Sequence, residues 1–122
     1  EALSFEGNTG PYLLYTYARA KSILKKAKRK KKVKLYVGDA EKSLLLSIAQ
    51  FPEIVECALA EFSPSAIANY SFSLAQKFNE FYHSHKVIGS DNEQFRLSIV
   101  EAVSVTLKNS LMLLGIETLE EM

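Results

Sequence analysis

Apolar side chains recur at the spacing of an α-helix along most of this 122-residue chain. The segment 64–85 shows the pattern most clearly, because its large apolar residues return every three or four positions and fall on one helical face. No segment sustains the period-2 alternation of a half-buried strand. The sequence therefore predicts an all-α fold, in which segment 64–85 turns these side chains toward the core: Ile67, Tyr70, Leu74, Phe78 and Phe81.

The sequence predicts about five helices joined mostly by short loops, and a proline marks the start of three of them. Pro11, Pro52 and Pro64 each suit the first turn of a helix, where the missing N–H is not needed. The helices are expected at about 11–28, 40–50, 53–62, 64–85 and from the turn at 90 to about 114. In the third of them, one apolar stripe is expected to face the core: Ile54, Val55, Ala58, Leu59 and Phe62.

Four further residues indicate where helices begin and end. Ser63 is expected to cap the helix that Pro64 opens. Ser90 and Glu93 have the spacing of a capping box, in which a hydroxyl and a carboxylate each accept a backbone N–H of the other residue. Gly115 suits the left-handed conformation that ends many helices. Together these signals predict a helical bundle.

Length and composition favour one globular domain over residues 1–122. Hydrophobic residues make up 48% and charged residues 24%, which argues against a disordered chain. No apolar run approaches the roughly 18 residues that span a bilayer, so no membrane is expected. The single Cys57 cannot form an intrachain disulfide and is interpreted as a small buried hydrophobe. We expect a cytoplasmic protein.

The net charge of the chain is only +1, but residues 25–34 form a dense basic segment. Because like charges this close repel one another, the segment favours water or a polyanion over a core. RNA, DNA or an anionic membrane surface would all suit it, and a solvated loop without a partner is the alternative. Its eight cations are Lys25, Lys26, Lys28, Arg29, Lys30, Lys31, Lys32 and Lys34.

Catalytic and metal-binding signals are weak. The sequence has no glycine-rich phosphate loop, no Cys-x-x-Cys and no His-Glu-x-x-His motif, so we expect neither a catalytic residue nor a metal site. His83 and His85 are two positions apart and would point to different faces of a helix. They are interpreted as polar residues at the end of a helix.

Aromatic side chains leave two interpretations open. Tyr12, Tyr15 and Arg19 fall along one side of the first helix, and a ring beside a guanidinium suits an unstacked base and its phosphate. Alternatively, the tyrosines pack in the fold and Arg19 forms a surface ion pair. Tyr82 follows the core residue Phe78 by one turn, where a structural role and a contact role are equally open.

Four blocks resemble one family, the C-terminal anticodon-binding (DALR) domain of arginyl-tRNA synthetases. The first is FEGNTGPYLLYTYAR at 5–19, followed by FPEIV at 51–55 and LAQKFNEFY at 74–82. The last is LGI at 114–116 with the terminal EM at 121–122. The blocks occur in the family's order and extend over nearly the whole chain.

The resemblance implies an α-helical anticodon-binding domain of a class Ia aminoacyl-tRNA synthetase, which holds the anticodon loop of tRNA-Arg. It also implies that Tyr15, Arg19, Tyr82 and Met122 face the anticodon. The family's catalytic signatures are absent, so we expect a domain cut from a longer enzyme and unable to activate arginine alone. Its partners would be tRNA-Arg and the parent's catalytic domain, where ATP is used, with no cofactor in this domain.

Two other functions stay open beside RNA binding. A helical module with an exposed apolar patch would dock the catalytic domain or another partner protein. A membrane-surface domain would use the basic segment against anionic lipid.

Overall fold

The computed structural model describes residues 10–27 and 37–116, and these residues form five helices and no strand. Each helix lies within a few residues of its predicted position, so the all-α bundle of about five helices is confirmed. The helices are α2 (Gly10–Lys26), α3 (Asp39–Ala49), α4 (Phe51–Glu61), α5 (Pro64–Ser84) and α6 (Glu93–Leu113).

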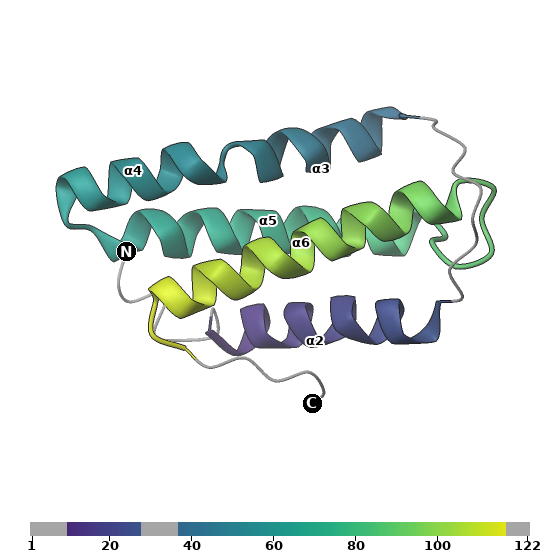
Figure 1. The fold of residues 1–122 in the computed structure, drawn as a ribbon, viewed down its shortest axis with the longest axis horizontal. Coiled ribbons are helices and arrows are strands. Elements are labelled where there is room, and N and C mark those ends of the chain that lie inside the picture. The colour runs from purple at the N-terminus through teal and green to yellow at the C-terminus, as the bar shows by residue number, and fades with distance from the viewer. Residues whose placement is uncertain (1–9, 28–36, 117–122) are drawn as a thin grey trace.

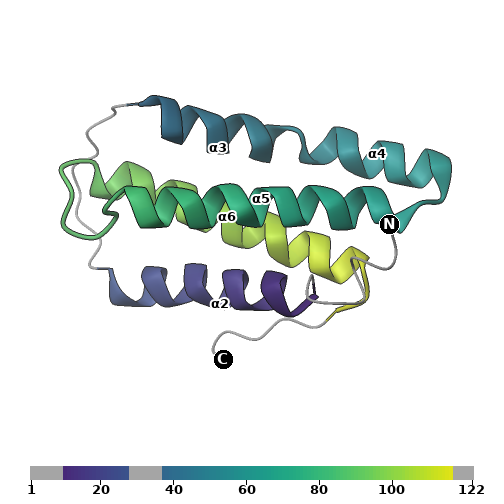
Figure 2. The same ribbon diagram turned by 180° about the vertical axis from the view of Figure 1, so that it is seen from behind.

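Helices α5 and α6 form the middle of the bundle (Figures 1 and 2). Helix α2 lies along one side of them, and α3 and α4 lie end to end along the other side. The loop from α5 to α6 is at the same end of the bundle as the last residues of α2 (Figure 1). All five predicted core residues of α5 are buried, and the core also includes Leu13, Tyr17, Val100, Val103, Leu107 and Leu111.

Pro52 separates α3 from α4. Because proline lacks an N–H and its ring crowds the preceding turn, the helix is interrupted at Gln50 and begins again at Phe51. The hydroxyl of Tyr70 in α5 donates a 2.6 Å hydrogen bond to the Ser47 carbonyl just before this break. Burial raises the pKa of Tyr70 to about 12, so the phenol stays a neutral donor at physiological pH.

The core-facing stripe predicted for α4 is wrong in part. Ile54 packs against the core and Ala58 is buried, but Leu59 is 69% exposed and Phe62, which ends the helix with φ of 52°, is 93% exposed. Helix α4 packs mainly on α5, so only a narrow strip of its surface is covered. The interpretation of Cys57 as buried is wrong for the same reason, since its thiol is exposed and 3.8 Å from a Glu61 oxygen.

Taken together, α3 and α4 make a 23-residue stretch, Asp39–Glu61, that is long and apolar enough to cross a membrane by length and composition alone. Its apolar runs are short, because the stretch contains five acidic residues and one lysine. Core helices of soluble proteins pass the same test, so the stretch is weak evidence for a membrane span. In this bundle one side of it packs on α5 and α6.

Gly115 ends α6 as predicted, with a positive φ of 78°. Its N–H donates to the Met112 carbonyl, and the N–H of Ile116 donates to the Leu111 carbonyl at 2.8 Å. These two bonds satisfy carbonyls that the helix end would otherwise leave unpaired. Ser63 occupies the N-cap of α5 as predicted, but its hydroxyl bonds the Ser65 hydroxyl instead of capping the helix.

Candidate functional site

The Arg19 side chain lies between two tyrosine rings at one end of the bundle. Its central guanidinium carbon is 4.9 Å from the ring centre of Tyr15 and 4.8 Å from that of Tyr82. Tyr15 precedes Arg19 by one turn of α2, whereas Tyr82 reaches the same place from the last turns of α5. The structure thus brings together three of the four side chains for which the sequence implied a common role.

Two neutral groups hold the Arg19 guanidinium by hydrogen bonds. Nη2 donates to the Tyr15 hydroxyl at 2.6 Å, and Nη1 donates to Oδ1 of Asn79 at 2.8 Å. A guanidinium carries five N–H groups, so these bonds orient it and leave others for a ligand. Tyr15 and Tyr82 remain 46% and 38% exposed, which leaves part of each ring open to solvent.

These side chains line a cleft of about 820 Å³ between α2, the end of α5 and the loop that follows it. The cleft has an aromatic part around Arg19 and a more basic part near the end of α2. Charge and ring surface therefore occur in one concavity, which suits a nucleic-acid strand. Its lining residues are Tyr15, Ala18, Arg19, Ser22, Ile23, Lys26, Tyr82, His83, His85, Lys86, Val87 and Ile88.

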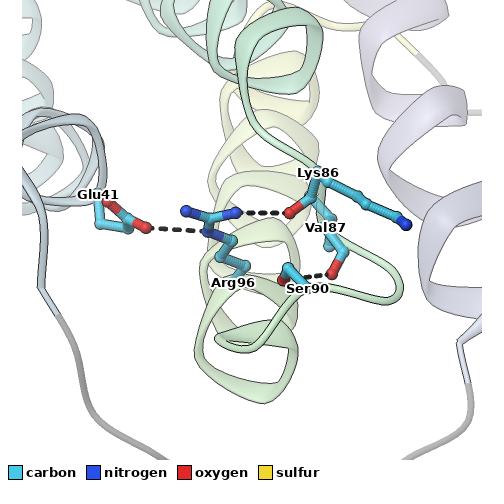
Figure 3. A network of polar contacts seen from close by, with 5 residues as sticks. All are labelled: Glu41, Lys86, Val87, Ser90 and Arg96. Atoms are coloured by element: carbon cyan, nitrogen blue, oxygen red, sulfur yellow. Dashed lines mark hydrogen bonds and ion pairs between the residues drawn. The ribbon is translucent and has the colours of Figure 1, made fainter.

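The loop from α5 to α6 forms one wall of the cleft and is held from α6. Arg96 donates a 2.6 Å hydrogen bond to the Lys86 carbonyl, and the Ser90 hydroxyl donates to the Val87 carbonyl (Figure 3). The Lys86 side chain extends away from Arg96 on the side of α2 (Figure 3). Because Val87 is buried in the core, the loop backbone is anchored at its middle.

The predicted capping box has a different geometry. Helix α6 begins at Glu93 with Asn92 at the N-cap position, so Ser90 lies two residues too early to cap it. The Glu93 carboxylate accepts the N–H of Gly89 instead of that of Ser90. Gly89 has φ of +87°, a conformation that L residues with a side chain rarely adopt. These residues therefore form a tight turn that shapes the cleft wall.

Arg96 also forms an ion pair with Glu41 of α3, at 2.9 Å between Nε and Oε2. Glu41 is only 2% exposed, and the Arg96 guanidinium lies 5.6 Å above the Phe81 ring. Burial alone raises the pKa of the Glu41 carboxyl, but the hydrogen bond from Arg96, a backbone hydrogen bond and nearby positive charge outweigh it. The pKa of Glu41 is consequently lowered from its usual 4.5.

The lowered pKa of Glu41 predicts a loss of stability in acid. The contribution is fully present above pH 4.5, where the unfolded chain is also ionised, and is lost as the pH falls through the folded pKa. Between pH 5 and pH 3 the wild-type free energy of unfolding should fall more steeply than that of Glu41→Gln, measured by urea denaturation. Parallel curves for the two proteins would contradict this role of Glu41.

Some of the residues predicted to bind tRNA are not among those that the structure describes. Met122 and the basic residues from Lys28 to Lys34 lie outside the described residues. Lys25 and Lys26 form the exposed last turn of α2, and Lys26 lines the cleft. The basic segment therefore begins at the edge of the cleft.

The structure also brings residues to the cleft that the sequence analysis missed. His83 and His85 both line it, although their spacing predicted different faces and no shared site. The His85 ring stacks on Phe81 at 5.0 Å, and within the described residues its buried Nδ1 has no hydrogen-bond partner. Asn79, which belongs to one of the family blocks, bonds Arg19 from beneath the cleft, and spacing within α5 does not indicate this contact because Arg19 lies 60 positions away in the sequence.

Tyr12 packs within the fold, as one of the two interpretations of the aromatic residues predicted. Its ring packs against Phe72 at 5.3 Å between centroids, and its hydroxyl accepts a hydrogen bond from Asn79. Tyr82 is covered on one side by Phe78, with ring centres 6.5 Å apart, and meets Arg19 as well. Tyr82 therefore packs in the fold and also lines the cleft.

Two proteins that are similar to this chain in sequence are both arginine–tRNA ligases. An arginine–tRNA ligase of Lactococcus lactis subsp. cremoris is 44% identical over 128 residues, which cover 100% of this chain and 22% of the relative. An arginine–tRNA ligase of Ignicoccus hospitalis is 45% identical over 122 residues, covering 96% of this chain and 20% of the relative. The chain thus spans about a fifth of the length of these relatives.

Solved structures agree with the sequence relatives. The arginyl-tRNA synthetase of Thermus thermophilus matches 100% of this chain and 22% of its own, with a TM-score of 0.88 and 38% identity. That of Plasmodium falciparum matches 95% of this chain and 22% of its own, with a TM-score of 0.83 and 31% identity. The sequence profile described as "DALR anticodon binding domain" matches residues 13–122. On this evidence the chain belongs to the DALR anticodon-binding domain family.

Proposed function

We propose that this chain holds the anticodon loop of tRNA-Arg in the cleft between α2 and the end of α5. The observation that carries the proposal is the Arg19 guanidinium held between Tyr15 and Tyr82 in a concave, basic surface. Loop nucleotides can splay out of the stack, and proteins then bind them on aromatic rings and guanidinium planes. A base would stack on the exposed part of Tyr15 and accept hydrogen bonds from unused N–H groups of Arg19.

Phosphates would be bound beside the base-binding part of the cleft. Lys26 and Lys86 line the cleft, and the basic segment continues along the sequence directly from Lys26. Lysines that approach phosphates release condensed counterions, which gives affinity at low salt. Met122 would complete the site through a polarizable thioether, as the family resemblance implies.

Aminoacylation itself would take place elsewhere in a longer arginine–tRNA ligase. The relatives carry that name and are about five times as long as this chain. The catalytic domain of the parent would use ATP and charge the distant end of the same tRNA, in the cytoplasm. The role of this chain would be to position tRNA-Arg.

Titration of the chain with tRNA-Arg and with a non-cognate tRNA, each at two salt concentrations, tests the proposal. Binding should be tighter for tRNA-Arg at both concentrations, because base contacts add to phosphate contacts that all tRNAs offer. Equal affinity for both tRNAs at both salts would contradict anticodon recognition and leave only phosphate binding. The measurement is fluorescence anisotropy of end-labelled tRNA.

The basic segment should set the salt dependence of that binding. Neutralising Lys30, Lys31 and Lys32 to glutamine should make the slope of log affinity against log salt shallower by about 1 to 2, since each phosphate contact on single strands contributes roughly 0.7. The control replaces three exposed lysines of other helices, Lys42, Lys77 and Lys108. An unaltered slope in the first variant would exclude a phosphate-binding role for the segment.

A second candidate function is docking of a partner protein through α3 and α4. Leu46 of α3, Leu59 of α4 and Phe62 at the C-cap of α4 are exposed. The two helices lie on the side of the bundle opposite α2 (Figure 1). The parent body is the proposed partner, and co-elution of the chain with an enzyme body that lacks it tests this. Changing Leu59 and Phe62 to glutamate should abolish co-elution, and unchanged co-elution would exclude this face. Sedimentation with anionic liposomes tests the expectation that no membrane is involved.

A further inference from the structure

We infer that Asn79 is a positioning residue that holds the Arg19 guanidinium between the Tyr15 and Tyr82 rings in the orientation that receives RNA. The inference rests on the proposed function of the cleft. Asn79 lies on α5 and is 9% exposed, so it acts from beneath the cleft and is not among the residues that line it. It would set RNA affinity through Arg19 alone.

The Asn79 amide makes three hydrogen bonds that involve both of its ends. Its Oδ1 accepts from Nη1 of Arg19 at 2.8 Å. Its Nδ2 donates to the Tyr12 hydroxyl at 2.9 Å and to Oγ1 of Thr16 at 3.1 Å. Both amide hydrogens are therefore used, and the oxygen is directed at the guanidinium.

Thr16 explains why the amide has this orientation. The Thr16 hydroxyl is fully buried and donates its own hydrogen to the Tyr12 carbonyl at 2.8 Å. It can therefore only accept from Asn79, which requires the amide nitrogen on that side. If the amide were flipped, its Oδ1 would face the Thr16 oxygen, and two acceptors would meet there. Its Nδ2 would face the Arg19 guanidinium, and two donors would meet there. The network consequently fixes the acceptor toward Arg19.

Fixing the guanidinium matters because a free arginine side chain samples many rotamers. Ordering it only when RNA binds would cost free energy that a preordered side chain does not lose. Asn79 and the Tyr15 hydroxyl together hold two of the guanidinium nitrogens. The remaining N–H groups are then presented in a constant direction.

A double-mutant cycle between Arg19 and Asn79 tests the inference. The probe is a fluorescent RNA stem–loop with the anticodon arm of tRNA-Arg. Asn79→Ala should weaken binding about tenfold, because the Arg19 side chain would then have to be ordered when RNA binds. In an Arg19→Ala background the same change should alter the affinity less than twofold, because the residue through which it acts is gone. Gln76→Ala, an exposed amide on the same helix, is the matched control.

Each outcome of the cycle separates the inference from the proposed function. If Arg19→Ala weakens binding and Asn79→Ala does not, the positioning role is overturned and the cleft assignment stands. An equal loss from Asn79→Ala in both backgrounds would show that it acts through the fold, which also overturns the inference. If Arg19→Ala changes nothing, both the proposed function and the inference fail.

Two further measurements guard against loss of folding in Asn79→Ala. Thr16→Val keeps Asn79 but removes the acceptor that orients it, and it should weaken binding several-fold only when Arg19 is present. The NMR order parameter of Arg19 Nε, measured without RNA, should fall in Asn79→Ala and stay constant in Gln76→Ala. An unchanged order parameter in a folded Asn79→Ala protein would overturn the inference independently of RNA.

Discussion

Replacing Arg19 with alanine is expected to weaken the binding of tRNA-Arg ten- to a hundredfold. The change removes a charge and the hydrogen-bond donors that the cleft presents, and charge-assisted bonds contribute about 1.5–3 kcal/mol each. The two rings that hold the guanidinium would also lose the cation between them. In the parent enzyme the same loss should appear as a raised KM for tRNA-Arg with a smaller change in kcat.

Arg19→Lys separates geometry from charge in this experiment. Lysine keeps the positive charge but has no planar fork to bond Asn79 and Tyr15 together, so most of the loss should persist. Lys77→Ala, which removes an exposed cation from α5, is the matched control and should have little effect. Wild-type affinity in Arg19→Lys would mean that only net charge matters. If Arg19→Ala weakens binding no more than Lys77→Ala does, anticodon binding in the cleft is rejected.

Replacing Arg96 with methionine is expected to lower the free energy of unfolding by about 3 kcal/mol, because removing one partner of a buried pair leaves the other charge uncompensated. Glu41, the remaining partner, is only 2% exposed. The Lys86 carbonyl would also lose the donor that holds the cleft wall. Such a loss is a large part of the total stability of a small domain, and urea denaturation measures it.

The double variant Glu41→Leu with Arg96→Met provides the comparison for this prediction. Replacing both partners of a buried pair by apolar residues is often nearly neutral, so most of the lost stability should return. Lys108→Met, an exposed change on the same helix, is the control for the substitution itself. A loss below about 0.5 kcal/mol in Arg96→Met, the size usual for surface changes, would contradict a structural role for the pair.

Much of the fold could be predicted from the sequence because it depends on local signals. All five residues of α5 that apolar spacing predicted for the core are buried. Pro52 marks the break between α3 and α4, and Gly115 marks the end of α6. Errors arose where a tertiary neighbour decides. The apolar stripe of α4 is longer than the surface that α5 covers, so Leu59 and Phe62 stay exposed. The spacing of apolar residues within one helix does not show how much of that helix its neighbour covers.

The site follows the same division between local and tertiary signals. Tyr15 and Arg19 lie one turn apart on a single helix, so their proximity could be predicted from their spacing. The position of Tyr82 left a contact role open, and only the family resemblance grouped this residue with Tyr15 and Arg19. Asn79 was not identified as a site residue, because its bonds join α5 to α2 across 60 or more positions. The ion pair of Glu41 with Arg96 spans 55 positions and left no sequence signal.

The most direct test of anticodon binding in the cleft is an NMR titration of the ¹⁵N-labelled chain with the anticodon stem–loop of tRNA-Arg. Backbone shifts should concentrate on Tyr15, Arg19 and Ser22 of α2, and on the segment from Tyr82 to Ile88. The exposed end of α4, including Leu59 and Phe62, should not respond. Shifts confined to α4, with the cleft unchanged at saturating RNA, would contradict anticodon binding in the cleft.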